Sequence, residues 1–168
     1  MQKTSCTDKK CKKCGWCCSA LGKDIGINDQ EDDKLKRLVF ERAGVIYLRS
    51  LNDYFLAMTP ETAEKLKAHA KKMGIKVDIR PNKLIYDRNT DKVIIYDYYL
   101  NHTVCPFYDK EEGCMIYEDR PTACKKFPNI DNSYAKEVEK FIKENNIDCT
   151  VISYEDAVKK CESFCKTL

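Results

Sequence analysis

The sequence predicts an α+β fold: a single compact domain in which helices flank a small, mainly antiparallel sheet. Stretches with helical spacing of apolar residues alternate with short runs rich in β-branched and aromatic residues. At 168 residues the chain has the length of one domain with its own core. We therefore expect residues 1–168 to form one domain, with residues 1–10 as a flexible N-terminal segment.

The first predicted helix begins after Asn28, which can act as the N-cap, with Glu31 at the position that a capping box needs. Gly44 supplies its stop. Its apolar positions recur at helical spacing and are Leu35, Leu38, Val39 and Ala43. A second helix is expected to begin at Thr59-Pro60 and to end at Gly74.

The remaining elements follow from β-rich runs and from two later helical stretches. Strands are expected at 45–49, 54–58, 75–79, 83–86 and 93–99. The polar turn 87–91 joins the last two strands, which predicts a hairpin. Further helices are expected at 134–144 and 155–168, with a strand at 150–154 between them.

Composition excludes several classes of function. A net charge of +3 gives no strong electrostatic case for nucleic acid or for an anionic membrane. The amino terminus lacks the apolar stretch of a signal peptide, and no run reaches transmembrane length, so we expect a cytoplasmic protein without a membrane partner. Eleven cysteines, an odd number, then indicate metal chelation rather than a secreted disulfide scaffold.

The first cysteine zone packs four thiols into eight residues, Cys11, Cys14, Cys17 and Cys18. Cys-x2-Cys-x2-Cys is the spacing of a loop that bends round a [4Fe–4S] cube and takes its fourth ligand from elsewhere. The spacing also suits zinc, for which a Cys-x2-Cys knuckle supplies two ligands at a time. Gly15 permits the tight backbone path. Because adjacent side chains diverge, we expect Cys17 or Cys18 to face a second ligand set or to pack without binding.

The second cysteine zone supplies the remaining thiols. The segment from Cys105 to Cys114 is predicted to be a hairpin-type loop with two thiols at its base. Cys105-Pro106 is the dipeptide that carries the remote ligand in many ferredoxin sites, so Cys105 is the preferred fourth ligand. Pro121 can open a short helix that presents Cys124.

These blocks together resemble a known family. They are Cys11-x2-Cys14-Gly15-x-Cys17-Cys18, then Cys105-Pro106-Phe107, then Gly113-Cys114-x-Ile116-Tyr117-Glu118-x-Arg120-Pro121-x2-Cys124-x2-Phe127-Pro128. The pattern is similar to the YkgJ-type cysteine-cluster family, also described as the CxxCxxCC zinc- or iron-chelating domain. The resemblance implies a metal or iron–sulfur centre held by the cysteines of these blocks, namely Cys11, Cys14, Cys17, Cys18, Cys105, Cys114 and Cys124. Two residues depart from the family pattern: Lys125 stands where an arginine is common, and Tyr108 where an aliphatic residue is usual.

Three functions are compatible with this reading. The first is a protein with a [4Fe–4S] cluster that acts in electron transfer, sensing or cluster handling, with an unidentified protein or redox partner. The second is a zinc-binding structural or interaction domain. The third is a metal-supported enzyme similar to a protein-lysine methyltransferase, because a related cysteine cluster is found in flagellin lysine N-methylases. Against it, the chain is short for a full methyltransferase and lacks a Gly-rich cofactor loop. The cysteine triplet with a remote Cys-Pro favours iron, and no catalytic residue is assigned.

Several residues near the cysteines have a structural and a functional interpretation. Arg120 is expected to pair with Glu118 or Asp119, or to tie the turn at Pro121 to the core, rather than to bind an anion. Trp16 is expected to act as a hydrophobic lid.

Among the remaining candidates, His102 could complete a mixed Cys/His site, but the many thiols make it unnecessary. Cys161 and Cys165 share one face of the last helix and either pack or lend a thiol to the site. Cys149 is isolated and is expected to pack.

Overall fold

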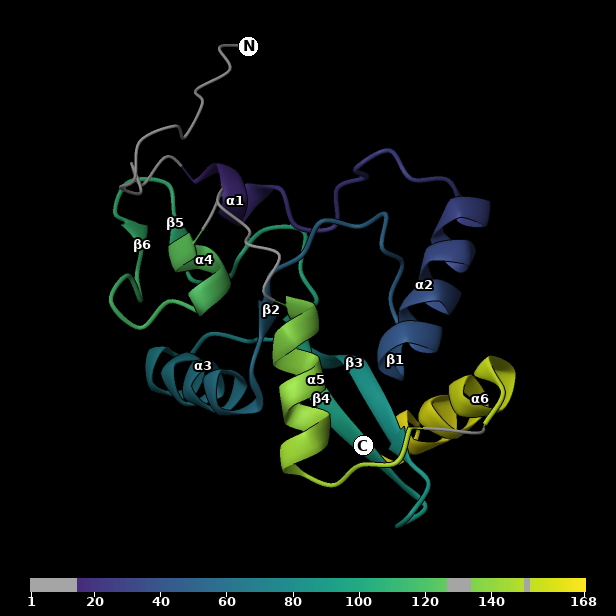
Figure 1. The fold of residues 1–168 in the computed structure, drawn as a ribbon. Coiled ribbons are helices and arrows are strands. Elements are labelled where there is room, and N and C mark those ends of the chain that lie inside the picture. The colour runs from purple at the N-terminus through teal and green to yellow at the C-terminus, as the bar shows by residue number, and fades with distance from the viewer. Residues whose placement is uncertain (1–14, 127–133, 150–151) are drawn as a thin grey trace.

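A computed structural model describes residues 15–126, 134–149 and 152–168. Helices surround a mainly antiparallel sheet, which confirms the predicted α+β class (Figure 1). The expected N-terminal segment 1–10, together with Cys11 and Cys14, lies outside these ranges. Within them, no helix is both long enough and apolar enough to cross a bilayer.

A four-stranded sheet with the order β1-β3-β4-β2 forms the centre of the fold. Its strands are β1 (Val45–Tyr47), β2 (Ala57–Met58), β3 (Ile79–Asp87) and β4 (Lys92–Leu100), and every neighbouring pair is antiparallel. β3 and β4 form the predicted hairpin across the polar turn. The strand predicted at 75–79 is wrong except for Ile79, because β4 ends at the partner of Ile79 and leaves the preceding residues no strand to pair with.

Local capping signals set the bounds of the first long helix, α2 (Asp29–Ala43). The Asn28 side chain accepts a hydrogen bond from the Glu31 amide at 2.9 Å, and the Asn28 amide donates to the Glu31 carboxylate at 3.3 Å. Gly44 ends the helix with a left-handed φ of 65°. The capping box and the glycine stop are therefore confirmed.

The orientation of α2 differs from what its apolar spacing suggests. Leu35 and Leu38 remain 39% and 38% exposed. The helix instead turns Val39 and Ala43 towards one core cluster and Phe40 towards another. Apolar spacing ordinarily marks the buried face of a helix. In α2 only Val39 and Ala43 of the four predicted positions pack against the core.

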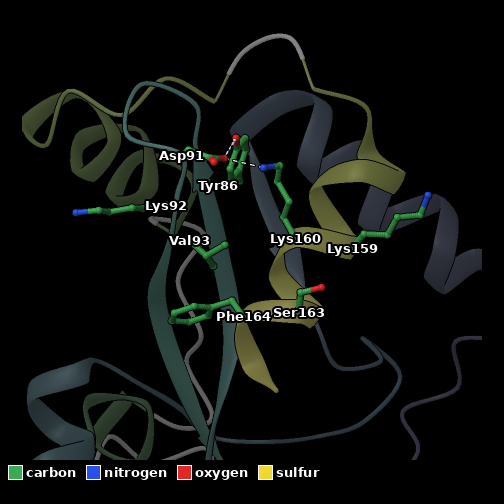
Figure 2. Close-up of a pocket in the computed structure, with 8 residues that line it drawn as sticks. All are labelled: Tyr86, Asp91, Lys92, Val93, Lys159, Lys160, Ser163 and Phe164. Atoms are coloured by element: carbon green, nitrogen blue, oxygen red, sulfur yellow. Dashed lines mark hydrogen bonds and ion pairs between the residues drawn. The ribbon is translucent and has the colours of Figure 1, made fainter. Parts of the chain in front are cut away.

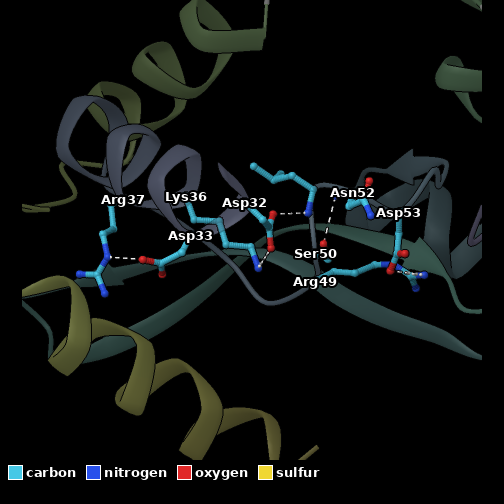
Figure 3. A network of polar contacts seen from close by, with 9 residues as sticks. Asp32, Asp33, Lys36, Arg37, Arg49, Ser50, Asn52 and Asp53 are labelled. Carbon is cyan, nitrogen blue, oxygen red and sulfur yellow. Dashed lines mark hydrogen bonds and ion pairs between the residues drawn. The ribbon is translucent and has the colours of Figure 1, made fainter. Parts of the chain in front are cut away.

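A buried carboxylate explains this orientation of α2 (Figure 3). Asp32 is 8% exposed, and it accepts a hydrogen bond from the Leu51 amide at 2.7 Å and pairs with Lys36 at 2.9 Å. Burial alone would raise the pKa of Asp32, but Lys36 and the Leu51 amide lower it below its usual value. The contact fastens one side of α2 to the 48–53 loop, where Arg49 and Asp53 also pair at 3.0 Å.

Three more long helices pack against the sheet: α3 (Pro60–Met73), α5 (Tyr134–Glu144) and α6 (Tyr154–Cys165). The Thr59 hydroxyl caps α3 by accepting from the Thr62 amide at 3.2 Å, and the expected stop at Gly74 is confirmed. The strand expected at 150–154 lies partly outside the described residues, and Tyr154 opens α6 instead.

The turn of the β3–β4 hairpin docks on α6, as Figure 2 shows. Asp91 accepts a hydrogen bond from the Tyr86 hydroxyl at 2.5 Å and lies 2.6 Å from the Lys160 amino group. A shallow pocket lies beside this contact, but the amino groups of Lys92 and Lys159 point away from it. The contact therefore serves to join two elements and does not gather charges around a ligand.

The first core cluster supports the cysteine-bearing segments. Its buried side chains come from α3, from β2, from the end of β4 and from the loops around them, and include Leu21, Leu56, Met58, Leu66 and Phe107. Cys105, Cys114 and Cys124 pack against this cluster. These segments lie together at one side of the molecule, and α6 lies at the opposite side (Figure 1).

Candidate metal centre

A one-turn helix, α1 (Trp16–Ser19), presents the first pair of described thiols. It begins after Gly15, whose φ of 73° favours glycine, which confirms the expected tight turn. A Cβ atom at this position would also lie 2.1 Å from the hydroxyl oxygen of Tyr108. The ring of Tyr108 thus fills the space that the missing side chain leaves, and a larger residue at position 15 is excluded on both grounds.

The two adjacent cysteines of α1 do not separate as expected. Their sulfur atoms lie 3.9 Å apart, and both Cys17 and Cys18 raise the pKa of Cys124. The divergence of about 100° per residue concerns the Cα–Cβ directions, whereas rotation about χ1 brings the two sulfurs together. Both thiols therefore face the same group of cysteines.

A small hairpin brings the second pair of thiols to α1. It consists of β5 (Tyr108–Asp109) and β6 (Gly113–Cys114), which confirms the predicted hairpin-type loop. The Cys105 amide donates a hydrogen bond to the Cys18 carbonyl at 2.7 Å. A hydrogen bond between the Cys18 and Cys105 thiols is the largest contribution that raises the pKa of Cys18 to about 12, and Cys114 adds a smaller one.

The fifth thiol belongs to α4 (Thr122–Lys126), which begins directly after Pro121 as predicted. The Lys125 amide donates to the Pro121 carbonyl at 3.1 Å and closes the first turn of this helix. Burial raises the pKa of Cys124 to about 12, and the neighbouring Cys17, Cys18 and Cys114 add to the shift. Three separate segments of the chain thus bring thiols to one place.

Three thiols of this group, those of Cys17, Cys18 and Cys124, lie in an environment that opposes ionisation. The hydrogen bond to Cys18, followed by burial, raises the pKa of Cys17 well above its usual value. A bound cation reverses this preference, because a metal coordinates thiolates and deprotonates them. A set of soft sulfur donors at a half-buried position fits zinc or iron and fits magnesium or calcium poorly.

Tyr54 adjoins the thiols, although the sequence placed it only in a predicted strand. Its hydroxyl oxygen is buried, and burial raises its pKa, with further contributions from Cys17, Cys124 and Cys18. The Trp16 ring packs against the Tyr54 ring at 5.9 Å between centroids and is 52% exposed. Trp16 therefore covers Tyr54 from the solvent side, and no local sequence signal points to Tyr54.

Arg120 contacts its own turn rather than the expected carboxylates. Its Nε donates to the Tyr117 carbonyl at 2.7 Å, and its guanidinium lies 3.6 Å from the centre of the Tyr117 ring. Its charge also opposes the rise in the pKa of Cys124. Asp119 pairs instead with His69, at 3.1 Å. Of the two alternatives expected for Arg120, the described residues show the contact with its own turn and no ion pair with Glu118 or Asp119.

The remaining described candidates have other roles. The Nε2 atom of His102 accepts a hydrogen bond from the Asp78 amide at 2.8 Å, so this histidine satisfies a backbone donor. Cys149 packs against the second core cluster, and Cys161 is buried in the third, with Cys165 packed beside it. The second core cluster consists of Val45, Ile85, Val138 and Ile147, and the third of Ile46, Leu84, Ala157 and Cys161. α6, which carries the last two, lies across the molecule from α1 (Figure 1).

The described residues alone contain no set of three cysteine, histidine or acidic side chains that is arranged to hold a metal ion. Cys11 and Cys14, the first two members of the triplet, lie outside the described ranges. The five other predicted ligands lie near enough to affect one another's ionisation, and their role as ligands stays a prediction.

Comparison with known proteins identifies the family of the chain. The family model CxxCxxCC, described as "putative zinc- or iron-chelating domain", matches residues 10–166, which is nearly the whole chain. The chain belongs to this family. No curated protein and no solved structure is similar enough to give a match. Membership in the CxxCxxCC family supports metal binding by a cysteine-rich domain and leaves the metal unspecified.

Proposed function

We propose that this CxxCxxCC protein holds an iron–sulfur cluster of the [4Fe–4S] type and acts in electron transfer, sensing or cluster handling. Cys11, Cys14 and Cys17 would supply the triplet and Cys105 the remote ligand. The observation that carries the proposal is the contact between α1 and the Cys105 loop, where the Cys105 amide meets the Cys18 carbonyl at 2.7 Å. That contact joins the two halves of a ferredoxin-type ligand pattern that are far apart in sequence.

One observation favours a second candidate, a zinc-binding structural or interaction domain. Zn–S bonds of about 2.3 Å place neighbouring sulfurs of a tetrahedral site about 3.8 Å apart. The Cys17 and Cys18 sulfurs lie 3.9 Å apart, close to this value. Two of the three remaining thiols of the group, those of Cys114 and Cys124, would complete such a site.

The surrounding residues of this chain would orient the thiols and limit the access of water. Gly15 lets α1 turn into the site. The Tyr54 hydroxyl lies buried beside the sulfurs, where a phenol can donate to a thiolate, and Trp16 covers it. When bound, an iron–sulfur cluster supplies one-electron redox chemistry at a potential that such hydrogen bonds and burial adjust.

The proposal extends to the setting of the protein. It places the chain in the cytoplasm, where thiols stay reduced, and gives it an unidentified protein or redox partner. It also treats the chain as one domain, because a metal held by both cysteine zones would tie its N-terminal segment to the 105–126 region.

Anaerobic purification followed by metal analysis and a visible spectrum tests the proposal. A brown protein that contains iron and acid-labile sulfide supports the cluster. A colourless protein with stoichiometric zinc and no sulfide overturns it in favour of the second candidate. Cys105→Ser should then lower the metal content, and Cys161→Ser, which removes a thiol from the third core cluster, serves as the matched control.

A further inference from the structure

The outward side of α2 carries an apolar stripe that the rest of the described chain leaves open. Leu35 and Leu38 are 39% and 38% exposed, although they lie in the middle of a 15-residue helix. A groove of about 950 Å³ runs along them, with Ile27 at one end and Glu41 at the other. α2 lies at an edge of the molecule, away from α1 (Figure 1). The stripe therefore belongs to a surface that is separate from the thiols.

The charged side chains of α2 fall into a paired and an unpaired group. In the paired group, Asp32 lies 2.9 Å from Lys36, and Asp33 and Arg37, which both line the groove, lie 2.8 Å apart (Figure 3). Beside the stripe stand three charged side chains, Lys34, Glu41 and Arg42, that form no ion pair within the described ranges.

Helical geometry explains why these three charges stay unpaired within the helix. Ion pairs on a helix join residues three or four apart. Four residues after Lys34, and four before Arg42, stands Leu38. Glu31 stands three residues before Lys34, but its carboxylate accepts a hydrogen bond from the Asn28 amide instead. Glu41 lies four residues after Arg37, but that guanidinium already pairs with Asp33 and Glu155. The charges beside the stripe are thus available to another molecule.

We infer that the stripe binds the same stripe of a second copy of this chain, with the two α2 helices antiparallel about a two-fold axis. Positions 31, 35, 38 and 42 alternate steps of four and three, the spacing of a helix–helix seam. In an antiparallel pair centred between Leu35 and Leu38, each of these leucines meets the other type from the second copy. Glu31 then faces Arg42 of the second copy, and the two-fold axis repeats every contact.

The residues that flank the seam complete the match. Lys34 and Glu41 are seven positions apart, so both lie on the same side of the seam. In the antiparallel pair Lys34 lies beside Glu41 of the second copy, and the symmetry forms this pair twice. A parallel pair in register would place Glu31 opposite Glu31 and Arg42 opposite Arg42 on the seam. The stripe is thus self-complementary in one orientation only, which an interface between identical chains requires.

The interface is small, and this sets the expected affinity. A 15-residue helix is about 22 Å long, so each copy contributes one short helix face. Interfaces of this size belong to the weak, transient class. We therefore expect a reversible dimer with a dissociation constant in the micromolar range or weaker, and weaker still at high salt because the flanking pairs are exposed.

Sedimentation equilibrium of the full chain with charge-exchange variants tests the inference. Lys34→Glu alone and Glu41→Lys alone each place like charges beside the seam twice, so each should raise the dissociation constant about tenfold or more. The double variant restores opposite charges and should return the dissociation constant to near the wild-type value. Lys72→Glu, an exposed position on α3, serves as the matched control and should leave association unchanged.

Leu38→Glu provides the second measurement, because a residue already 38% exposed can be replaced without unfolding the helix. It should abolish the dimer while the circular dichroism and the thermal transition stay unchanged. A wild-type chain that remains monomeric up to millimolar concentration overturns the inference. A dimer that the single charge variants leave intact, or that the double variant fails to restore, also overturns it.

Discussion

The cysteines of this protein occupy two contrasting regions. At one end, thiols meet from α1, from the β5–β6 hairpin and from α4, and these elements have only two to five residues each. At the other end, Cys149, Cys161 and Cys165 pack into apolar clusters beneath long strands and helices. The same residue type thus has two roles, and the elements around it decide which role applies.

The comparison shows how each end is stabilised. Helices of four or five residues are not stable by themselves, because nucleation costs more than so few hydrogen bonds return. The thiol end therefore depends on the first core cluster and, under the proposed function, on its metal. The sheet end has nine-residue strands and a buried ion pair between Lys83 and Asp97, at 2.5 Å with both side chains 8% exposed.

Metal removal should produce the largest difference in local stability between the two ends. After chelation, we expect amide protection in α1 and α4 to fall by more than about 100-fold, because a structural metal contributes its binding free energy to folding. The amides of β3 and β4 should keep most of their protection. Hydrogen exchange followed by mass spectrometry measures both, and an equal loss at the two ends would contradict the comparison.

Breaking the buried ion pair should destabilise the sheet end and leave the metal content of the thiol end unchanged. Lys83→Met leaves the Asp97 carboxylate buried without its cation, and we expect a loss of about 3–5 kcal/mol in the free energy of unfolding. Urea denaturation measures this loss. The metal content of the folded protein should stay the same, and a variant that keeps its stability but loses its metal would show that the two ends are coupled.

Gly15→Ala tests the entry of α1 into the thiol end. The left-handed backbone costs about 1–2 kcal/mol for an L-residue, and the new Cβ would lie 2.1 Å from the Tyr108 hydroxyl oxygen. We expect lower metal occupancy and a loss of more than about 2 kcal/mol of stability. Adding Tyr108→Ala removes the steric contact and should recover part of the loss, whereas a full recovery would mean that the backbone conformation contributes nothing.

The smallest predicted effect concerns the pH dependence of the contact that orients α2. The pKa of Asp32 is lowered in the folded state, so its contribution is present above the unfolded pKa of about 3.9 and is lost as the pH falls through the lower folded value. Asp32→Asn should cost about 1–2 kcal/mol at neutral pH, and the difference from wild type should shrink below about pH 4. Urea titrations at pH 7 and pH 3 measure it; a constant difference would contradict the assigned cause.

Much of the fold could be predicted because its signals are local. The caps at Asn28 and Thr59 and the stops at Gly44 and Gly74 act within one helical turn, and all four are as expected. The β3–β4 hairpin follows from a polar turn between two β-rich runs, and its register needs no distant residue. The error at 75–79 falls where a strand would require a partner that the described part of the chain does not provide. Of the strand expected at 150–154, the structure shows that Tyr154 begins a helix.

The candidate site was predictable as a list of residues but not as an arrangement. Cysteine spacing and the Cys105-Pro106 dipeptide indicated the ligand types. The closeness of Cys17 and Cys18, and the buried hydroxyl of Tyr54 beside them, depend on rotamers and on loops that are distant in sequence. No spacing rule contains that information, because it arises only when α1 packs against the 105–126 region.

The sequence by itself determined where α2 and α3 begin and end, the hairpin, and the membership of the thiol-rich blocks in one family. The tertiary structure alone decided which cysteines meet and which face of α2 is buried. Asp32 accepts a hydrogen bond from the Leu51 amide and so sets the orientation of that helix. This orientation leaves Leu35 and Leu38 at the surface. The physical reason is range: a cap is satisfied by neighbours along the chain, whereas a buried carboxylate or a group of thiols is satisfied only by segments that folding brings together.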